Sequence, residues 1–357
     1  MKTKPMTKFA ILALSLVLVA CAGGGSEEAG CPAIDGREIN VVATTPMIGE
    51  FVSQVGGENI NLTVLMPPEA NPHTYEPAPQ DAGTIAEADL VFYTGLLYEP
   101  AALVKLLENS ACSTDILSEV GESVFPIEFK EGGHDDHDDH DDEEGHDDEE
   151  GHDDEEGHDD HDDEEGHDDE EGHDDHEGHN HGAYDPHFWF DPSRVAYAAE
   201  YIESRLIQFD PENESSYTSS ADSFVSELND LTKQVSELIS TVPSQNRKLI
   251  TTHESLGYLE AKFGLEVLST IIPSLNSANE ISPSDLAGVI DVIEDNNVKV
   301  IFIESEAPSV YSETIVAETG IKPVTGLYVE TLKPGQSYSE FLISNVTLIT
   351  ENLQDTD

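Results

Sequence analysis

A run of histidine and acidic residues in the middle of the chain limits the possible folds more than any other stretch. Residues 134–181 repeat the letters G-H-D-D-E-E and hold 12 of the 15 histidines in the 357-residue chain. From Glu131 to Gly182 there are 30 of the 75 acidic residues, no Lys or Arg, and nothing apolar. Such a segment cannot contribute to a hydrophobic core. We therefore expect residues 131–183 to form a disordered loop inserted into a folded unit.

The run also has the composition of a metal-binding segment. Imidazoles placed among carboxylates bind borderline divalent cations such as zinc, nickel or copper. A solvated acidic linker with incidental histidines is the alternative, but such linkers seldom repeat one ligand type at fixed spacing. We predict auxiliary, low-affinity metal sites at His134, His137, His140, His146, His152, His158, His161, His167, His173, His176, His179 and His181. Outside the run the chain has three histidines, which are His73, His187 and His253.

The acidity of the chain is not confined to the run. The formal net charge is −60, and without the 30 acids of the run 45 acids still face 15 bases. Nucleic acid and an anionic membrane surface would both repel such a protein. The balance favours a cation as cargo, although a solvated acidic face is the commoner reason for surface Asp and Glu.

Residues 1–20 have the features of a secretory signal peptide. Three lysines precede an apolar stretch, Phe9 to Ala20, that is too short for a comfortable membrane span. The letters L-V-A-C end at Cys21 and resemble a bacterial lipobox, so we expect Cys21 to be lipidated and residues 21–35 to form a tether. An unmodified Cys21 after a plain signal peptide is the alternative. The protein is then expected outside the cytoplasm, anchored to a membrane by its lipid or periplasmic.

The two remaining cysteines, Cys31 and Cys112, are most simply explained by a disulfide. An exported chain meets an oxidising compartment, where an even pair of thiols is expected to be oxidised. Two thiols so far apart in the sequence are too few for a Cys-based zinc site.

Segments typical of buried strands alternate with segments of helical spacing on both sides of the run. This alternation predicts an α/β fold with parallel sheets that are covered on both faces. We expect two Rossmann-like lobes, residues 36–190 and 243–357, joined by helices within 191–242. The expected strands are 39–44, 60–65, 89–94, 248–252, 265–270, 299–303 and 322–326. The expected helices are 46–55, 82–88, 99–108, 193–209, 211–241, 311–319 and 337–353, with two more after Ser255 and Pro283.

The connection between the lobes is expected to be a long, rigid helix. The apolar positions Phe224, Leu228, Leu231, Val235, Leu238 and Val242 form one stripe, and the opposite face is polar. At 1.5 Å per residue this helix is roughly 45 Å long.

The three isolated histidines lie in stiff loops or just after strands. His73 is in N-P-H-T-Y-E-P, His187 is in D-P-H-F-W-F-D-P, and His253 follows the strand K-L-I-T-T. Each alone is best explained as an ordinary loop or core histidine. Because ligands of α/β sheets bind at the carboxyl ends of strands, the three together predict one metal site between the lobes. A tetrahedral zinc site needs a fourth ligand. Glu304, Glu330 or water can supply it, and periodicity does not choose among them.

At these motifs the chain resembles the substrate-binding lipoproteins of zinc/manganese ABC importers, in particular the zinc-uptake type with a His-rich loop. The resemblance runs from about residue 39 to 350. Its segments are N-P-H-T-Y-E-P (71–77), D-P-H-F-W-F-D-P (185–192), the stretch 251–265, I-F-I-E-S-E-A-P-S (301–309) and the closing G-L-Y-V-E-T-L. By this resemblance His73, His187 and His253 are metal ligands. Glu330 stands where relatives place a fourth ligand, and Glu304 lies behind the ligands.

The resemblance implies a function in transport rather than catalysis. Zn²⁺ is the implied cargo, captured between the lobes by a monomer and delivered to a membrane permease with its ATPase. Manganese-binding members tend to have a carboxylate where this chain has His253, and three imidazoles suit zinc better than manganese. The alternatives are a manganese importer component and an adhesin or zinc store on the same fold. A zinc hydrolase is the least favoured, since Gly257 stands where an H-E-x-x-H motif needs its second histidine.

Overall fold

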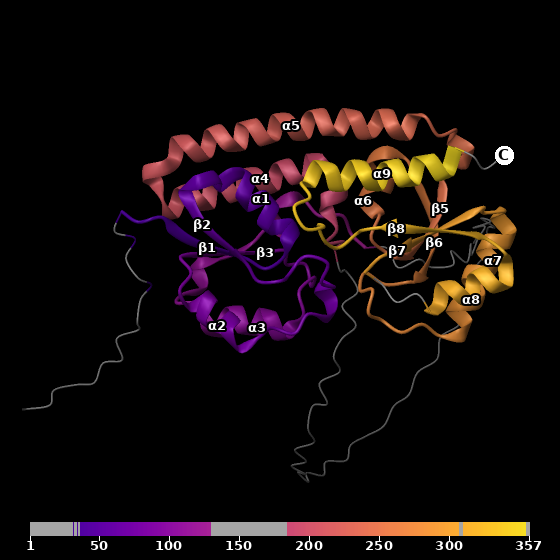
Figure 1. The fold of residues 1–357 in the computed structure, drawn as a ribbon, viewed down its shortest axis with the longest axis horizontal. Helices are drawn as coiled ribbons and strands as arrows, with labels where there is room; N and C mark the ends of the chain where they lie inside the picture. The colour runs from indigo at the N-terminus through magenta and orange to yellow at the C-terminus, as the bar shows by residue number, and fades with distance from the viewer. Residues whose placement is uncertain (1–30, 32–33, 35, 130–183, 307–309, 355–357) are drawn as a thin grey trace, which may run out of the picture.

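The computed structural model describes two α/β lobes with one long helix lying along both of them (Figure 1). The described residues are 31, 34, 36–129, 184–306 and 310–354. The expected signal peptide, the lipidation site Cys21, most of the tether and the histidine run lie outside the described residues. The predicted fold class, an α/β protein with parallel sheets, is confirmed.

The first lobe is built on a four-stranded parallel sheet with the order β2-β1-β3-β4. Its strands are β1 (Ile39–Ala43), β2 (Ile60–Val64), β3 (Leu90–Tyr93) and β4 (Leu117–Glu119). Its helices are α1 (Pro46–Gly56), α2 (Pro79–Ala86) and α3 (Ala101–Ser110). Since all four strands run the same way, their carboxyl ends meet at one edge, which is where loops can bring side chains together.

The second lobe contains two parallel strand pairs that lie next to each other. β5 (Lys248–His253) pairs with β6 (Glu266–Ile272), β7 (Val300–Glu304) pairs with β8 (Lys322–Leu327), and β5 lies beside β7. The helices are α6 (Gly257–Phe263), α7 (Pro283–Asn296), α8 (Val310–Thr319) and α9 (Tyr338–Gln354). His253 and Glu304 are therefore the last residues of two neighbouring strands.

Some boundaries differ from those expected, for local reasons. Helix α2 begins at Pro79, three residues before the predicted start. Proline is favoured in the first turn of a helix, and the Asp81 carboxylate accepts the backbone N–H of Ala78 at 2.7 Å. Helix α3 begins after Glu99 rather than at it, because the Glu99 side chain binds the preceding turn. Strand β4 was not predicted, since three residues carry no detectable periodicity.

The connecting helices are α4 (Pro192–Phe209) and α5 (Glu214–Ser240). Helix α5 has 27 residues and is therefore roughly 40 Å long, slightly less than expected. It packs against α1 and α4 on one side of the molecule and against α9 on the other (Figure 1). The buried stripe of α5 continues from Val235 to Ile239, whereas Leu238, which was expected in the stripe, is only half-buried. The helix repeats every 3.6 residues, so a step of four from Val235 keeps to the buried face.

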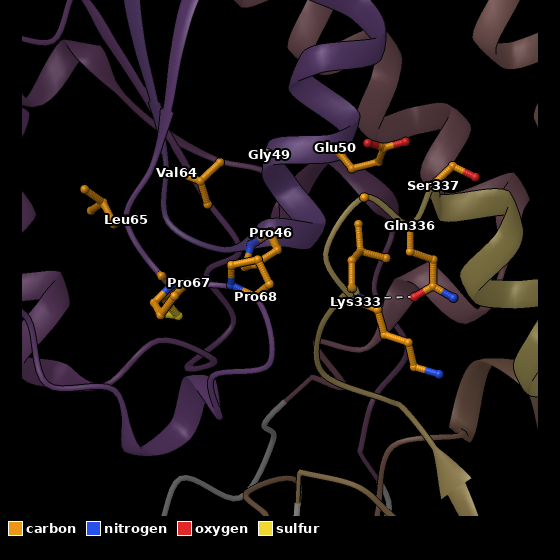
Figure 2. A pocket seen from close by; sticks show the side chains of 13 residues that line it. Pro46, Gly49, Glu50, Val64, Leu65, Pro67, Pro68, Lys333, Gln336 and Ser337 are labelled. Carbon is orange, nitrogen blue, oxygen red and sulfur yellow. Dashed lines mark hydrogen bonds between the residues drawn. The ribbon is translucent and has the colours of Figure 1, made fainter.

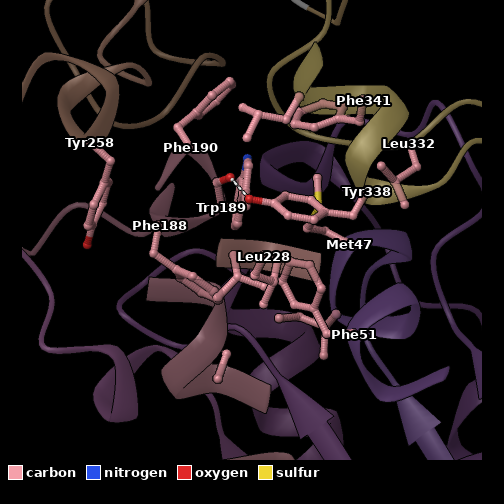
Figure 3. Close-up of a cluster of buried hydrophobic side chains, with 14 of the residues drawn as sticks. Met47, Phe51, Phe188, Trp189, Phe190, Leu228, Tyr258, Leu332, Tyr338 and Phe341 are labelled. Atoms are coloured by element: carbon pink, nitrogen blue, oxygen red, sulfur yellow. Dashed lines mark hydrogen bonds between the residues drawn. The ribbon is translucent and has the colours of Figure 1, made fainter. Parts of the chain in front are cut away.

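One hydrophobic core contains side chains of both lobes (Figure 3). The ring of Phe51 in α1 lies 6.2 Å from that of Phe188, 6.3 Å from Phe224 and 5.2 Å from Tyr338 in α9. Trp189 connects the lobes by hydrogen bonds as well. Its indole N–H donates to the carbonyl of Val329 at 2.8 Å, and its own carbonyl accepts the hydroxyl of Tyr338 at 2.7 Å.

Two further observations concern a disulfide and the lengths of the described helices. Cys31 and Cys112 are joined by a disulfide, which attaches the first described residue to the segment after α3. Within the described part of the chain, no helix combines the length and apolar character that crossing a bilayer requires.

Candidate metal centre

His73 is presented by a short turn that both lobes hold in place. The turn Pro72–Thr74 follows Asn71, whose side-chain oxygen accepts the backbone N–H of His73 at 2.9 Å. The amide nitrogen of the same Asn71 donates across the interface to Ser277 at 3.0 Å and to the carbonyl of Glu306 at 3.2 Å. The first candidate ligand is therefore positioned by contacts with the second lobe.

His187 is oriented by the acid two residues before it. One oxygen of Asp185 accepts both the backbone N–H and the ring Nδ1–H of His187, each at 2.8 Å. This pair of bonds places a proton on Nδ1, so that Nε2 carries the lone pair whenever the ring is neutral. His187 is fully buried.

His253 is held in the same manner by Glu304. Its Nδ1 is hydrogen-bonded to one oxygen of Glu304, and its backbone N–H donates to the other at 3.2 Å. The hydroxyl of Ser255 also donates to Glu304 at 3.2 Å. Glu304 thus lies behind His253, on the side of the ring away from the centre.

Glu330 lies in the loop after β8 and faces all three rings. Its Oε1 is 3.0 Å from Nε2 of His73 and 3.0 Å from Nε2 of His253. Its Oε2 is 3.5 Å from Nε2 of His187. One ligand atom from each of the four residues lies within 4.8 Å of the others, and no other cluster of this kind was found within the described residues. The structure therefore brings together all four predicted ligands.

The donor set fits a divalent cation. Nε2 of His187 and of His253 is buried, and among the described residues it makes no well-formed hydrogen bond and faces only Glu330, at 3.5 and 3.0 Å. A buried polar atom without a well-formed hydrogen bond is unfavourable. A zinc ion bound by three imidazole nitrogens and one carboxylate oxygen would satisfy these atoms in the tetrahedral geometry zinc prefers.

The charges of the metal-free site are strongly coupled. Burial lowers the pKa of His187, but the carboxylates of Asp185 and Glu330 outweigh burial and raise it to about 9. Burial likewise lowers the pKa of His253, and Glu304 and Glu330 raise it well above its ordinary value. Burial raises the pKa of Glu330, but His73 and His253 hold it well below its ordinary range. Protons on these rings consequently compete with a metal ion.

Sequence reasoning missed three side chains that support the site. Asp185 could have been noticed, since it is an acid two residues before a candidate ligand. Tyr98 donates its hydroxyl to Oε2 of Glu330 at 2.9 Å, and no spacing in the sequence indicates this contact. Glu306 accepts the backbone N–H groups of Val329 and Glu330 at 3.2 and 3.3 Å, and burial and nearby carboxylates raise the pKa of Glu306 to about 8.

A separate hollow on the surface has a different character (Figure 2). It lies between α1, the segment around Pro67 and the loop before α9. Among the described residues that line it, Glu50 is the one acid and none is a histidine. This hollow therefore lacks the ligands of a metal site.

The two-lobed α/β fold and the cluster of three imidazoles and one carboxylate define a protein built to bind a metal ion. The sequence agrees with this class. The model of the family described as "Zinc-uptake complex component A periplasmic" matches residues 41–352. The chain belongs to this family, as its motifs predicted.

Relatives across nearly the whole chain are named for either zinc or manganese. The high-affinity zinc uptake system protein ZnuA of Bacillus subtilis (strain 168) is 27% identical over 97% of this chain and 96% of its own length. The manganese ABC transporter substrate-binding lipoprotein PsaA of Streptococcus anginosus is 25% identical, over 98% and 99%. Among solved structures, the periplasmic zinc-binding protein TroA from Treponema pallidum matches with a TM-score of 0.70 at 20% identity. That match covers 88% of this chain and 99% of TroA, and it supports the fold.

Proposed function

We propose that the protein captures Zn²⁺ outside the cytoplasm with His73, His187, His253 and Glu330 and delivers it to a membrane permease that an ATPase drives. One observation carries the proposal. Nδ1 of His187 and Nδ1 of His253 are each hydrogen-bonded to a carboxylate, while Nε2 of both rings faces Glu330. Ring orientation by an acceptor on the far nitrogen is the usual arrangement of histidine metal ligands.

The ligand set favours zinc over manganese. Three imidazoles and one carboxylate form a softer, lower-coordinate set than the oxygen-rich octahedral sites that manganese prefers. Manganese remains the alternative cargo because several relatives are named for it. The proposal includes no chemical reaction, since Glu330 takes the position that a zinc hydrolase keeps open for water.

Two further parts of the proposal concern residues outside the described ranges. The lipidated Cys21 is proposed to anchor the protein, and the histidine run at 134–181 to collect ions at lower affinity. If deletion of the run changes neither total zinc stoichiometry nor uptake at low zinc, that role is refuted. An adhesin or zinc store on this fold is distinguished from an importer component by a deletion experiment. Cells that lack an adhesin or a store would still import zinc normally.

Metal titration of the protein without residues 134–181 tests the main proposal. We expect one tight zinc equivalent that manganese displaces poorly. His73→Ala should abolish it, because the site loses one of its four ligands. Thr74→Ala is the matched control, since its exposed side chain is adjacent in sequence and is not a ligand. Absence of a tight equivalent, or a preference for manganese, would overturn the proposal.

A further inference from the structure

We propose that Tyr98 determines metal specificity by holding one oxygen of Glu330 away from the ion. With Oε2 occupied by the phenol, Glu330 binds through Oε1 alone, which keeps the site four-coordinate and favours zinc over manganese. This inference rests on the proposed function, because it takes Glu330 to be a metal ligand.

The contact is direct and fully enclosed. The hydroxyl of Tyr98 lies 2.9 Å from Oε2 of Glu330 and 3.1 Å from the main-chain carbonyl of the same residue. Both of these atoms are acceptors, so the single hydroxyl proton is donated to Glu330 in either case. Tyr98 is 1% exposed, so water does not compete for this bond. Its ring also packs edge-on against His73, with centroids 5.1 Å apart.

The two oxygens of Glu330 have different surroundings. Oε1 lies 3.0 Å from Nε2 of both His73 and His253, whereas Oε2 lies 3.5 Å from Nε2 of His187 and is bonded to Tyr98. Oε1 therefore faces two imidazoles and accepts no hydrogen bond from Tyr98. An ion bound by the three rings would therefore be coordinated by Oε1.

The backbone before Tyr98 is fixed in an unusual conformation. Gly95, Leu96 and Leu97 have φ values of 76°, 53° and 63°, in the left-handed region that leucine rarely adopts. The buried carboxylate of Glu99 accepts the N–H groups of Thr94 and Gly95 at 2.7 and 2.9 Å. Strained turns held this firmly occur at functional sites. The turn thus fixes the position of the Tyr98 hydroxyl beside Oε2 of Glu330.

Zinc and manganese differ in the number of ligand atoms that they prefer. Zinc is stable with four nitrogen, oxygen or sulfur ligands, whereas manganese favours six ligands that are rich in oxygen. A Glu330 free to bind through both oxygens would add a fifth ligand atom and an oxygen. Holding Oε2 on Tyr98 therefore disfavours manganese more than zinc.

Tyr98→Phe in the full-length protein tests this inference, because phenylalanine keeps the ring contacts and removes only the hydroxyl. We expect the ratio of zinc to manganese affinity, measured by competition titration, to fall roughly 10- to 100-fold, the size typical for residues that support metal ligands. The first equivalent of bound Co²⁺ should also lose intensity in its visible absorption bands. Four-coordinate Co²⁺ absorbs strongly, and higher-coordinate Co²⁺ absorbs weakly.

Tyr338→Phe is the matched control. Tyr338 is also 1% exposed, but its hydroxyl donates to the carbonyl of Trp189 and to no ligand, so the ratio and the cobalt spectrum should not change. Equal loss of affinity for both metals in Tyr98→Phe, with an unchanged cobalt spectrum, would overturn the inference and leave Tyr98 a structural residue. If the unaltered protein binds no tight metal equivalent, the proposed function itself fails.

X-ray absorption at the zinc edge of the unaltered protein, loaded with one equivalent, gives a reading that needs no variant. A first coordination sphere of four nitrogen or oxygen atoms supports the inference, and a sphere of five contradicts it.

Discussion

Acids stand behind the imidazoles at the metal centre, and they decide how the site responds to pH. Asp185 and Glu304 each accept a hydrogen bond from Nδ1 of a histidine, which increases the basicity of Nε2. The same acids raise the pKa of the rings they contact. A stronger metal ligand is therefore also a stronger proton acceptor, and the balance between metal and proton depends on pH.

Zinc affinity is expected to rise with pH from 6.5 to at least about 9. The pKa of His187 is raised from 6.5 to about 9 in the metal-free protein, so the ring holds a proton at neutral pH that zinc must displace. Affinity should increase about tenfold per pH unit for each proton released. Glu330 adds no such proton, because its pKa is held well below its ordinary range. Titrations with zinc between pH 6.5 and 9 measure this slope.

Asp185→Asn is the informative variant for this experiment. The amide no longer raises the pKa of His187, so one proton fewer should be released and the slope of zinc affinity against pH should be smaller than in the unaltered protein. A zinc affinity that does not change between pH 6.5 and 9 would contradict the protonation states inferred for the site.

At the scale of elements, the sequence predicted most strands and helices but not the parts that depend on tertiary contacts. The strand at Val300–Glu304 and the stripe of α5 were predictable because burial leaves an apolar pattern along the chain. The four candidate ligands were predictable because three histidines stood alone and the surrounding motifs resembled a known family. Tyr98 was not, because its contact with Glu330 depends on the left-handed turn before it and on two lobes meeting.

The aromatic cluster around Phe51 is expected to be essential for stability. Phe51→Ala removes a fully buried ring that packs on Phe188, Phe224 and Tyr338, and should lower the free energy of unfolding by about 3–5 kcal/mol. Chemical denaturation measures the loss. Tyr197→Ala, which truncates an exposed ring, is the control and should have a much smaller effect. Equal losses of unfolding free energy in the two variants would show that the cluster around Phe51 does not contribute more to stability than an exposed ring.

At the scale of the whole molecule, the proposed ligands connect the lobes. His73 and His187 come from the side of the first lobe, and His253 and Glu330 from the second. A metal ion bound by all four would therefore oppose any separation of the lobes. Because the unfolded chain cannot assemble this ligand set, binding also opposes unfolding.

Zinc should accordingly raise the melting temperature. At free zinc a thousandfold above the dissociation constant, the expected stabilisation is about 4 kcal/mol. The raised pKa of His187 stabilises the metal-free fold fully below pH 6.5, and this contribution is lost as pH rises through about 9. The zinc-induced shift should therefore be larger at pH 8 than at pH 6.5. Differential scanning calorimetry with His73→Ala as control measures it, and an unchanged melting temperature in saturating zinc would refute it.

The contacts of α9 set an order of events during folding. Tyr338 and Phe341, near the C-terminal end of the chain, pack against Phe51 and Phe190, which are synthesised much earlier. The shared core around Phe51 is therefore complete only after α9 has been synthesised and has packed in place. Such long-range contacts slow folding. Packing around Phe51 in the first lobe consequently depends on a helix that the ribosome makes much later.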